Sequence, residues 1–127
     1  MDYKMAKASA NWWIEAMKRQ CNHLYPTKVI HDGCSFVVVD SSLSQELARF
    51  EEVLYNAISD CLIKQSYLSL TCCWYPNRDL SKLLQKANIS RDYLPPRAAM
   101  EICGNSVKVS LNGEEPPRTL HPVAKLL

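Results

Sequence analysis

Apolar residues recur at helical spacing in two long stretches of the chain. Between residues 4 and 23, Ala10, Trp13 and Met17 follow one another at intervals of three and four, which places side chains on one face of an α-helix. Residues 43–62 carry the second and clearer set: Leu43, Leu47, Phe50, Leu54, Ala57 and Cys61. The pattern predicts two amphipathic helices. The first should end near Pro26, because proline disfavours helical geometry in the residue before it, and the second should start near Ser42.

The period of the apolar pattern changes to two after residue 66. Leu68, Leu70, Cys72 and Trp74 alternate with Ser69, Thr71 and Cys73, which predicts a strand over residues 67–75 with the first four side chains on one side. Two shorter strands are expected at 98–103 and 107–111, joined by a tight turn at Gly104-Asn105. Between the first strand and this hairpin, Asn77 is a suitable N-cap for a short helix that runs to about Asn88. Residues 27–41 fit either a short hairpin or a partly ordered loop.

These elements predict one α+β domain over residues 1–127. Two N-terminal helices should pack on one face of a small three-stranded antiparallel sheet, with a third short helix in the connection. The first strand can be central or at an edge. Residues 1–5 and 114–127 are expected to be extended or frayed. The predicted core consists of Leu47, Phe50, Leu54, Leu70, Leu84 and Val109.

Composition and charge narrow the class of protein. The chain is 47% hydrophobic and 22% charged with three glycines, which is typical of a folded domain. Its net charge of +2 is too small to indicate non-specific nucleic-acid or membrane binding. The longest aliphatic or aromatic run is Phe36–Val39, whereas crossing a bilayer takes about 20 residues. Charged side chains interrupt the first twenty residues, so we expect a cytoplasmic protein without a secretory signal.

Catalytic and metal-binding signatures are weak. Cys21 and His23, followed by His31 and Cys34, offer the ligand types of a zinc site, but the Cys-x-His spacing is too tight for the usual pattern. Three glycines cannot supply a phosphate-binding loop. We therefore expect no enzyme, no metal and no cofactor, and free thiols at all six cysteines. A thiol-dependent enzyme is the minor alternative.

Charge is unevenly distributed along the chain. Residues 40–65 carry five acidic and two basic residues, whereas residues 77–127 carry eight basic and five acidic ones. Basic residues interleaved with tyrosines can follow a nucleic-acid backbone or an acidic protein surface, although a solvated face is the alternative. Trp12 lies one residue off the stripe of the first helix, where it is either a contact residue or packed under residues 27–41. The candidate partner-binding residues are Trp12, Tyr75, Arg78, Lys82, Lys86, Arg91, Tyr93 and Arg97.

Several short motifs together resemble small uncharacterised proteins of bacteriophages and integrative elements of gut Firmicutes. They are Ala10-Asn11-Trp12-Trp13, Phe50-Glu51-Glu52 with Leu54, Tyr75-Pro76-Asn77, Leu80 with Ala87-Asn88-Ile89, and Leu94-Pro95-Pro96-Arg97 with Met100. The chain departs from that group at Asn112–Pro116, where a Gly-rich turn is usual.

The resemblance implies a mobile genetic element and an anti-defence role, and it brings no catalytic residues. We therefore expect a non-enzymatic binding protein that inhibits a host defence system, such as an anti-CRISPR protein that blocks an effector nuclease. The alternative is a nucleic-acid-binding accessory protein of the element's replication, transfer or transcription control. In both cases the partner is a macromolecule and not a membrane.

Overall fold

A computed structural model describes the backbone of residues 3–24, 28–31, 34–37, 41–113 and 117–120, and the side-chain surroundings of 4–20, 44–113 and 117–120. Its helices are α1 (Tyr3–Leu24), α2 (Ser41–Lys64) and α3 (Arg78–Ala87), with a 3-10 turn η1 (Arg91–Tyr93). Its strands are β1 (Lys28–His31), β2 (Cys34–Val37), β3 (Tyr67–Cys73), β4 (Tyr75–Pro76), β5 (Arg97–Cys103), β6 (Ser106–Leu111) and β7 (Arg118–Thr119). The α+β class is confirmed, and the 27–41 region contains the antiparallel hairpin β1–β2.

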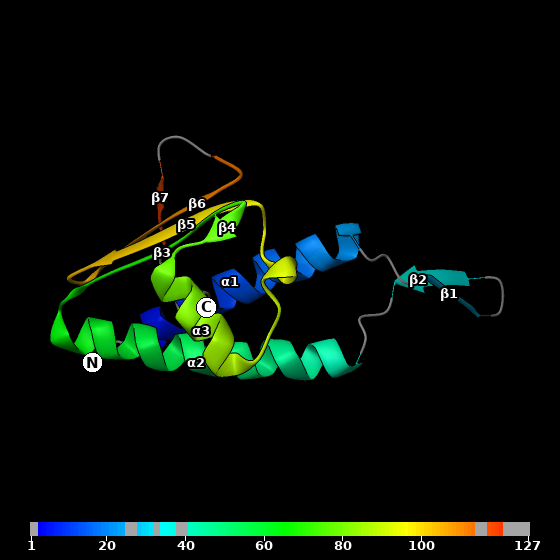
Figure 1. Cartoon of the computed structure of the whole chain (residues 1–127), viewed down its shortest axis with the longest axis horizontal. Coiled ribbons are helices and arrows are strands. Elements are labelled where there is room, and N and C mark those ends of the chain that lie inside the picture. The colour runs from blue at the N-terminus through cyan, green and yellow to red at the C-terminus, as the bar shows by residue number, and fades with distance from the viewer. Residues whose placement is uncertain (1–2, 25–27, 32–33, 38–40, 114–116, 121–127) are drawn as a thin grey trace, which may run out of the picture.

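The main sheet is antiparallel and has the order β4-β3-β5-β6-β7 (Figure 1). The three predicted strands form its centre, and the two-residue strands β4 and β7 extend it to five. Three strands were expected because a two-residue strand leaves no periodic signal in the sequence. Residues 1–5 were expected to be extended or frayed, whereas α1 already starts at Tyr3.

The helices cover one face of this sheet, but their placement differs from the expected one. The main helix contacts with the sheet come from α2, against β3 and β5, and from α3, against β3 and β4. Helix α1 packs mainly along α2 and reaches η1 (Figure 1). We expected α1 and α2 on the sheet. Asn77 alone separates β4 from α3, so the chain turns α3 directly under β3. The position of this short helix on the sheet cannot be predicted from the periodicity of apolar residues.

Burial along the strands alternates, as a sheet covered on one side requires. Leu70 and Cys72 of β3 are buried among the helices, as are Met100 of β5 and Val107 and Val109 of β6. The residues between them form the open face, which is exposed or half-buried. The predicted core is confirmed, because Leu47, Phe50, Leu54, Leu70, Leu84 and Val109 are all at most 3% exposed.

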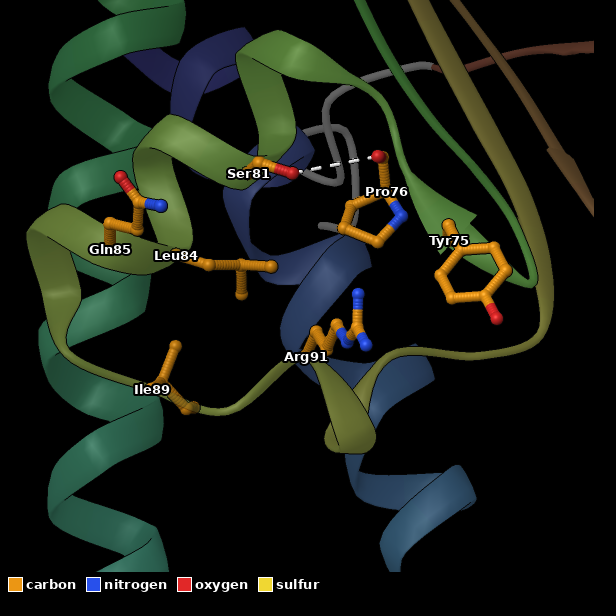
Figure 2. Close-up of a pocket in the computed structure, with 7 residues that line it drawn as sticks. All are labelled: Tyr75, Pro76, Ser81, Leu84, Gln85, Ile89 and Arg91. Carbon is orange, nitrogen blue, oxygen red and sulfur yellow. Dashed lines mark hydrogen bonds between the residues drawn. The ribbon is translucent and has the colours of Figure 1, made fainter.

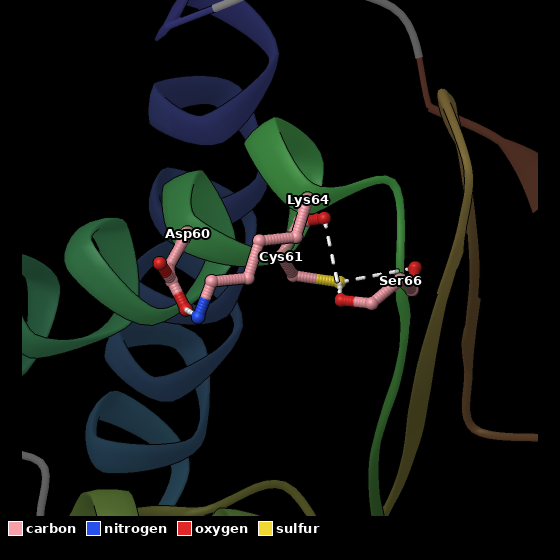
Figure 3. Close-up of polar contacts among 4 residues, drawn as sticks. All are labelled: Asp60, Cys61, Lys64 and Ser66. Atoms are coloured by element: carbon pink, nitrogen blue, oxygen red, sulfur yellow. Dashed lines mark hydrogen bonds and ion pairs between the residues drawn. The ribbon is translucent and has the colours of Figure 1, made fainter.

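The end of α2 is fixed by local hydrogen bonds. The amides of Gln65 and Ser66 donate to the carbonyls of Leu62 and Cys61, and Gln65 takes the left-handed φ of 52° that a Schellman ending requires. Figure 3 shows the side chains at this end: the Cys61 thiol donates to the Ser66 carbonyl at 3.3 Å, and Lys64 pairs with Asp60 at 3.1 Å. These contacts turn the chain from α2 into β3.

Helix α3 begins and ends where the sequence predicts. The Asn77 side chain accepts a hydrogen bond from the amide of Leu80 at 3.0 Å and so acts as the N-cap. At the other end, Asn88 has φ 55°, and the amide of Ile89 donates to the carbonyl of Leu84. Asparagine is one of the few residues that adopts this left-handed conformation at low cost.

The turn between β5 and β6 depends on a glycine with a left-handed backbone conformation. Cys103 pairs with Ser106, so Gly104 and Asn105 form a two-residue turn in which Gly104 has φ +62°. A Cβ at Gly104 would meet no atom within 4 Å. We expect Gly104→Ala to lower the free energy of unfolding in urea by about 1 kcal/mol, through backbone strain alone. Gly104→Asn should lose less stability, since asparagine tolerates a positive φ better than alanine does. An equal loss in both variants would contradict this explanation.

Candidate interaction surface

Trp74 is the most exposed of the large hydrophobic residues that the structure describes, at 71% of its area. It separates β3 from β4, and its backbone has the left-handed φ of 68°, which is costly for a bulky residue. The Trp74 amide donates to the carbonyl of Pro96 at 2.7 Å, and the pairing of Cys73 with Tyr75 closes the turn around it. The surrounding structure thus holds a strained, solvated indole in place, a feature that is concentrated at functional sites.

The next aromatic residue, Tyr75, contacts one arginine, and a second arginine lies two strands away. Tyr75 is 67% exposed, and the Arg91 guanidinium lies over its ring at 5.1 Å from the centroid. Cys73 pairs with Tyr75 on one side and with Arg97 on the other, so Arg97 lies about 10 Å from Tyr75 between Cα atoms, and the Arg97 guanidinium lies beside Gly113. We call Trp74, Tyr75 and Arg91 the aromatic corner.

A pocket of about 280 Å³ opens beside Tyr75, between α3 and the segment that follows it. Figure 2 shows Tyr75 and Pro76 on one side, facing Leu84 and Gln85 of α3, while the Arg91 side chain reaches into the space between them. Ser81 and Ile89 complete the lining, and the Ser81 hydroxyl donates to the Pro76 carbonyl at 3.5 Å. The pocket therefore combines apolar walls with an amide and a guanidinium.

Helix α3 carries a line of cations on its solvent side. Arg78, Lys82 and Lys86 are exposed and follow one another at intervals of four, which aligns them along one face over about 12 Å. Among the residues that the structure describes, none of these cations forms an ion pair. We call these three the basic row. Gln85, on the pocket rim, immediately precedes Lys86, so the pocket and the basic row adjoin.

The other two predicted partner-binding residues lie elsewhere. Trp12 is half-buried, packs against the core, and meets Trp13 edge to face with ring centroids 5.2 Å apart. Tyr93 is half-buried in η1 and also packs against the core. The structure thus brings Arg91 onto Tyr75, places Arg97 two strands away, and separately aligns the three cations of α3.

The alternation of β3 pointed to Trp74 as a neighbour of Leu70 and Cys72 on one side of the strand, and this prediction is wrong. The strand ends at Cys73, two residues before the predicted end at residue 75, and the turn carries the indole into solvent. The available signal was Pro76, which cannot donate to a ladder and which places a strand end nearby.

Two thiols of the sheet differ in environment. Cys72 lies in the core, where burial raises the pKa of its thiol and the neighbouring Cys73 adds a smaller effect in the same direction; it is therefore held in its unreactive form. Cys73 is exposed, and Cys61, Cys72, Cys73 and Cys103 are all free. In the described part of the chain, no three Cys, His, Asp or Glu side chains lie close enough to bind a metal. The side chains of Cys21, His23, His31 and Cys34 are outside that part.

The open face also holds one polar contact at its far end. The Tyr67 hydroxyl donates to the Glu101 carboxylate at 2.8 Å, and this hydrogen bond raises the pKa of the tyrosine. Tyr67 is 60% exposed and lies at the opposite end of β3 from the aromatic corner. It is a natural control for experiments on that corner.

No family model, curated protein or solved structure matches this chain. Within the described residues, no helix has the length and apolar character needed to cross a bilayer.

Proposed function

We propose that the protein acts by binding a macromolecule, without catalysis, and that the aromatic corner is its contact surface. The observation that carries the proposal is Trp74, a tryptophan exposed on a strained backbone beside Tyr75 and Arg91. Tryptophan, tyrosine and arginine are the residues that contribute most of the binding energy at protein interfaces. Folding alone gives no reason to hold an indole in solvent on a left-handed backbone, because burial would stabilise it and glycine would fit the turn better.

The proposed partner is a protein of a bacterial host, with a CRISPR effector nuclease as the specific hypothesis. The resemblance to proteins of mobile elements supports this choice. An inhibitor that imitates DNA would be strongly acidic, whereas this chain has a net charge of +2. The proposal therefore requires a mixed surface of aromatic and cationic side chains, and the aromatic corner is of this kind.

The proposal is tested by affinity capture from lysate of a gut Firmicute, with and without nuclease treatment, followed by mass spectrometry. We expect an effector nuclease to be enriched in both cases and its cleavage of target DNA to be inhibited by the purified protein. Enrichment should persist at moderate salt, because a contact centred on an indole depends weakly on ionic strength. Tyr67→Ala serves as a control that should capture the same partner.

The alternative function, a nucleic-acid-binding accessory protein, has a distinct outcome in the same experiment. Phosphate contacts make affinity fall steeply with salt concentration. If no host protein is enriched and the pure protein shifts short DNA with a steep salt dependence, the inhibitor proposal fails and the accessory function replaces it.

A further inference from the structure

We infer that the pocket beside Tyr75 binds one unstacked base of a single-stranded nucleic acid, and that the basic row contacts the phosphates next to it. This goes beyond the proposed function, because a base can be bound with or without a protein partner. The evidence is the juxtaposition of three features: a pocket with a planar cation in it, an amide on its rim, and a line of cations along the adjoining helix face.

The walls of the pocket suit a planar ring. The Arg91 guanidinium carbon lies over the Tyr75 ring at 5.1 Å from the centroid, and tyrosine rings and guanidinium planes are both common platforms for bases in single-stranded complexes. Leu84 and Ile89 are buried side chains that supply an apolar surface at the bottom of the pocket. An aliphatic protein side chain would fill the same space, but it would not use the flat face of the guanidinium.

The polar groups of the pocket suit the edge of a base. The Gln85 amide offers both a donor and an acceptor, the pair that recognises the donor and acceptor of an adenine edge. Ser81 already donates to the Pro76 carbonyl, so the Gln85 amide, the Arg91 guanidinium and the Tyr75 hydroxyl are the side-chain polar groups left to meet a ligand. A carboxylate ligand would be bound by cations alone and would not require the Gln85 amide. An ammonium ligand would be repelled by the positive charge of Arg91.

The charges around the pocket favour a polyanion. Arg78, Lys82 and Lys86 are exposed along one face of α3, and Arg91 adds a fourth cation at the pocket itself. Two exposed carboxylates, Asp79 and Asp92, lie in the same segment. By helical spacing Asp79 falls on the flank of α3 away from Ser81 and Gln85, so the basic row adjoins the pocket without an acid between them.

The test measures binding of a fluorescein-labelled 12-nucleotide DNA single strand to the full chain by fluorescence anisotropy at several salt concentrations. Contacts with three phosphates predict a slope of about −2 for log K against log salt, since each contributes about 0.7 on a single strand. Lys82→Gln with Lys86→Gln should reduce the slope by about 1.4. Arg91→Ala and Gln85→Ala alter exposed side chains, and we expect Arg91→Ala to weaken binding about fivefold or more.

The matched control is Lys108→Gln, which removes an exposed cation from the open face of β6 and should leave affinity and slope nearly unchanged. Equal binding of the single strand and its duplex would overturn the inference, because a stacked base cannot enter the pocket. So would unchanged affinity in both Arg91→Ala and Gln85→Ala, or absence of binding at low salt. If binding to the strand is absent while a host nuclease is still captured, the inference fails alone and the proposed function stands.

Discussion

Trp74→Gly is expected to weaken binding of the captured partner by about thirtyfold or more while leaving the protein at least as stable. A tryptophan at the centre of an interface contributes on the order of 2 kcal/mol or more, which corresponds to this factor. The stability should rise because a left-handed backbone costs a residue with a Cβ about 1–2 kcal/mol, and glycine avoids that strain. Part of the gain, about 0.5–1 kcal/mol, is offset by the greater freedom of glycine in the unfolded chain.

The two quantities are measured separately, by titration calorimetry with the partner and by urea denaturation of the free protein. Tyr67→Ala is the control, because it removes another exposed aromatic residue at the opposite end of β3 and should leave partner binding intact. Unchanged affinity in Trp74→Gly would show that the indole is not a contact. A loss of stability above 1 kcal/mol would show that the indole contributes to folding, which would remove the reason for proposing it as a binding residue.

Asn77→Ala should lower the free energy of unfolding by about 2 kcal/mol, a large effect for a half-buried polar residue. The side chain makes two bonds that this change removes: its oxygen accepts from the Leu80 amide at 3.0 Å, and its nitrogen donates to the Ser69 carbonyl at 2.8 Å. Loss of an N-cap costs about 1 kcal/mol, and loss of the second bond costs a similar amount. The backbone bond from the Asn77 amide to the Thr71 carbonyl remains.

Two variants separate these contributions. Asn77→Ser keeps an oxygen that caps the helix and loses the donor to Ser69, so we expect about half the effect of alanine. Asn77→Asp keeps the cap but places a carboxylate against the Ser69 carbonyl. We expect it to lose about as much stability as Asn77→Ser. If all three variants are equally destabilised, the bond to Ser69 matters and the cap does not; if alanine loses less than 0.5 kcal/mol, neither bond contributes as described.

The helices and the long strands were predictable because their signals are local. The three-and-four spacing of Leu47, Phe50 and Leu54 reflects contacts within one helix face, and these residues are indeed buried. Asn77 and Asn88 cap α3 through bonds to residues three to four positions away. The Gly104-Asn105 turn joins strands that pair directly. Each of these features is set by residues close together in the chain.

The proposed contact surface includes some of the residues that were selected from the sequence. Tyr75, Arg91 and Arg97 were selected as candidates from their clustering in the sequence, and the contact of the Arg91 guanidinium with the Tyr75 ring was not foreseen. Trp12 and Tyr93 show why composition is insufficient: both are aromatic residues near candidate contacts, yet both pack against the core. Whether an aromatic side chain is buried depends on the elements packed around it.

The sequence by itself determined the order of the three helices and the three long strands, the buried stripe of α2, the alternation of β3 and the limits of α3, because these depend on hydrogen bonds and contacts between near neighbours. Tertiary structure alone decided the position of Trp74, whose amide is held by Pro96, twenty-two residues away in the chain. It also created the pocket, which requires contact between Tyr75, before α3 in the chain, and Arg91, after it. Such features depend on how separate segments pack, and local periodicity carries no information about that packing.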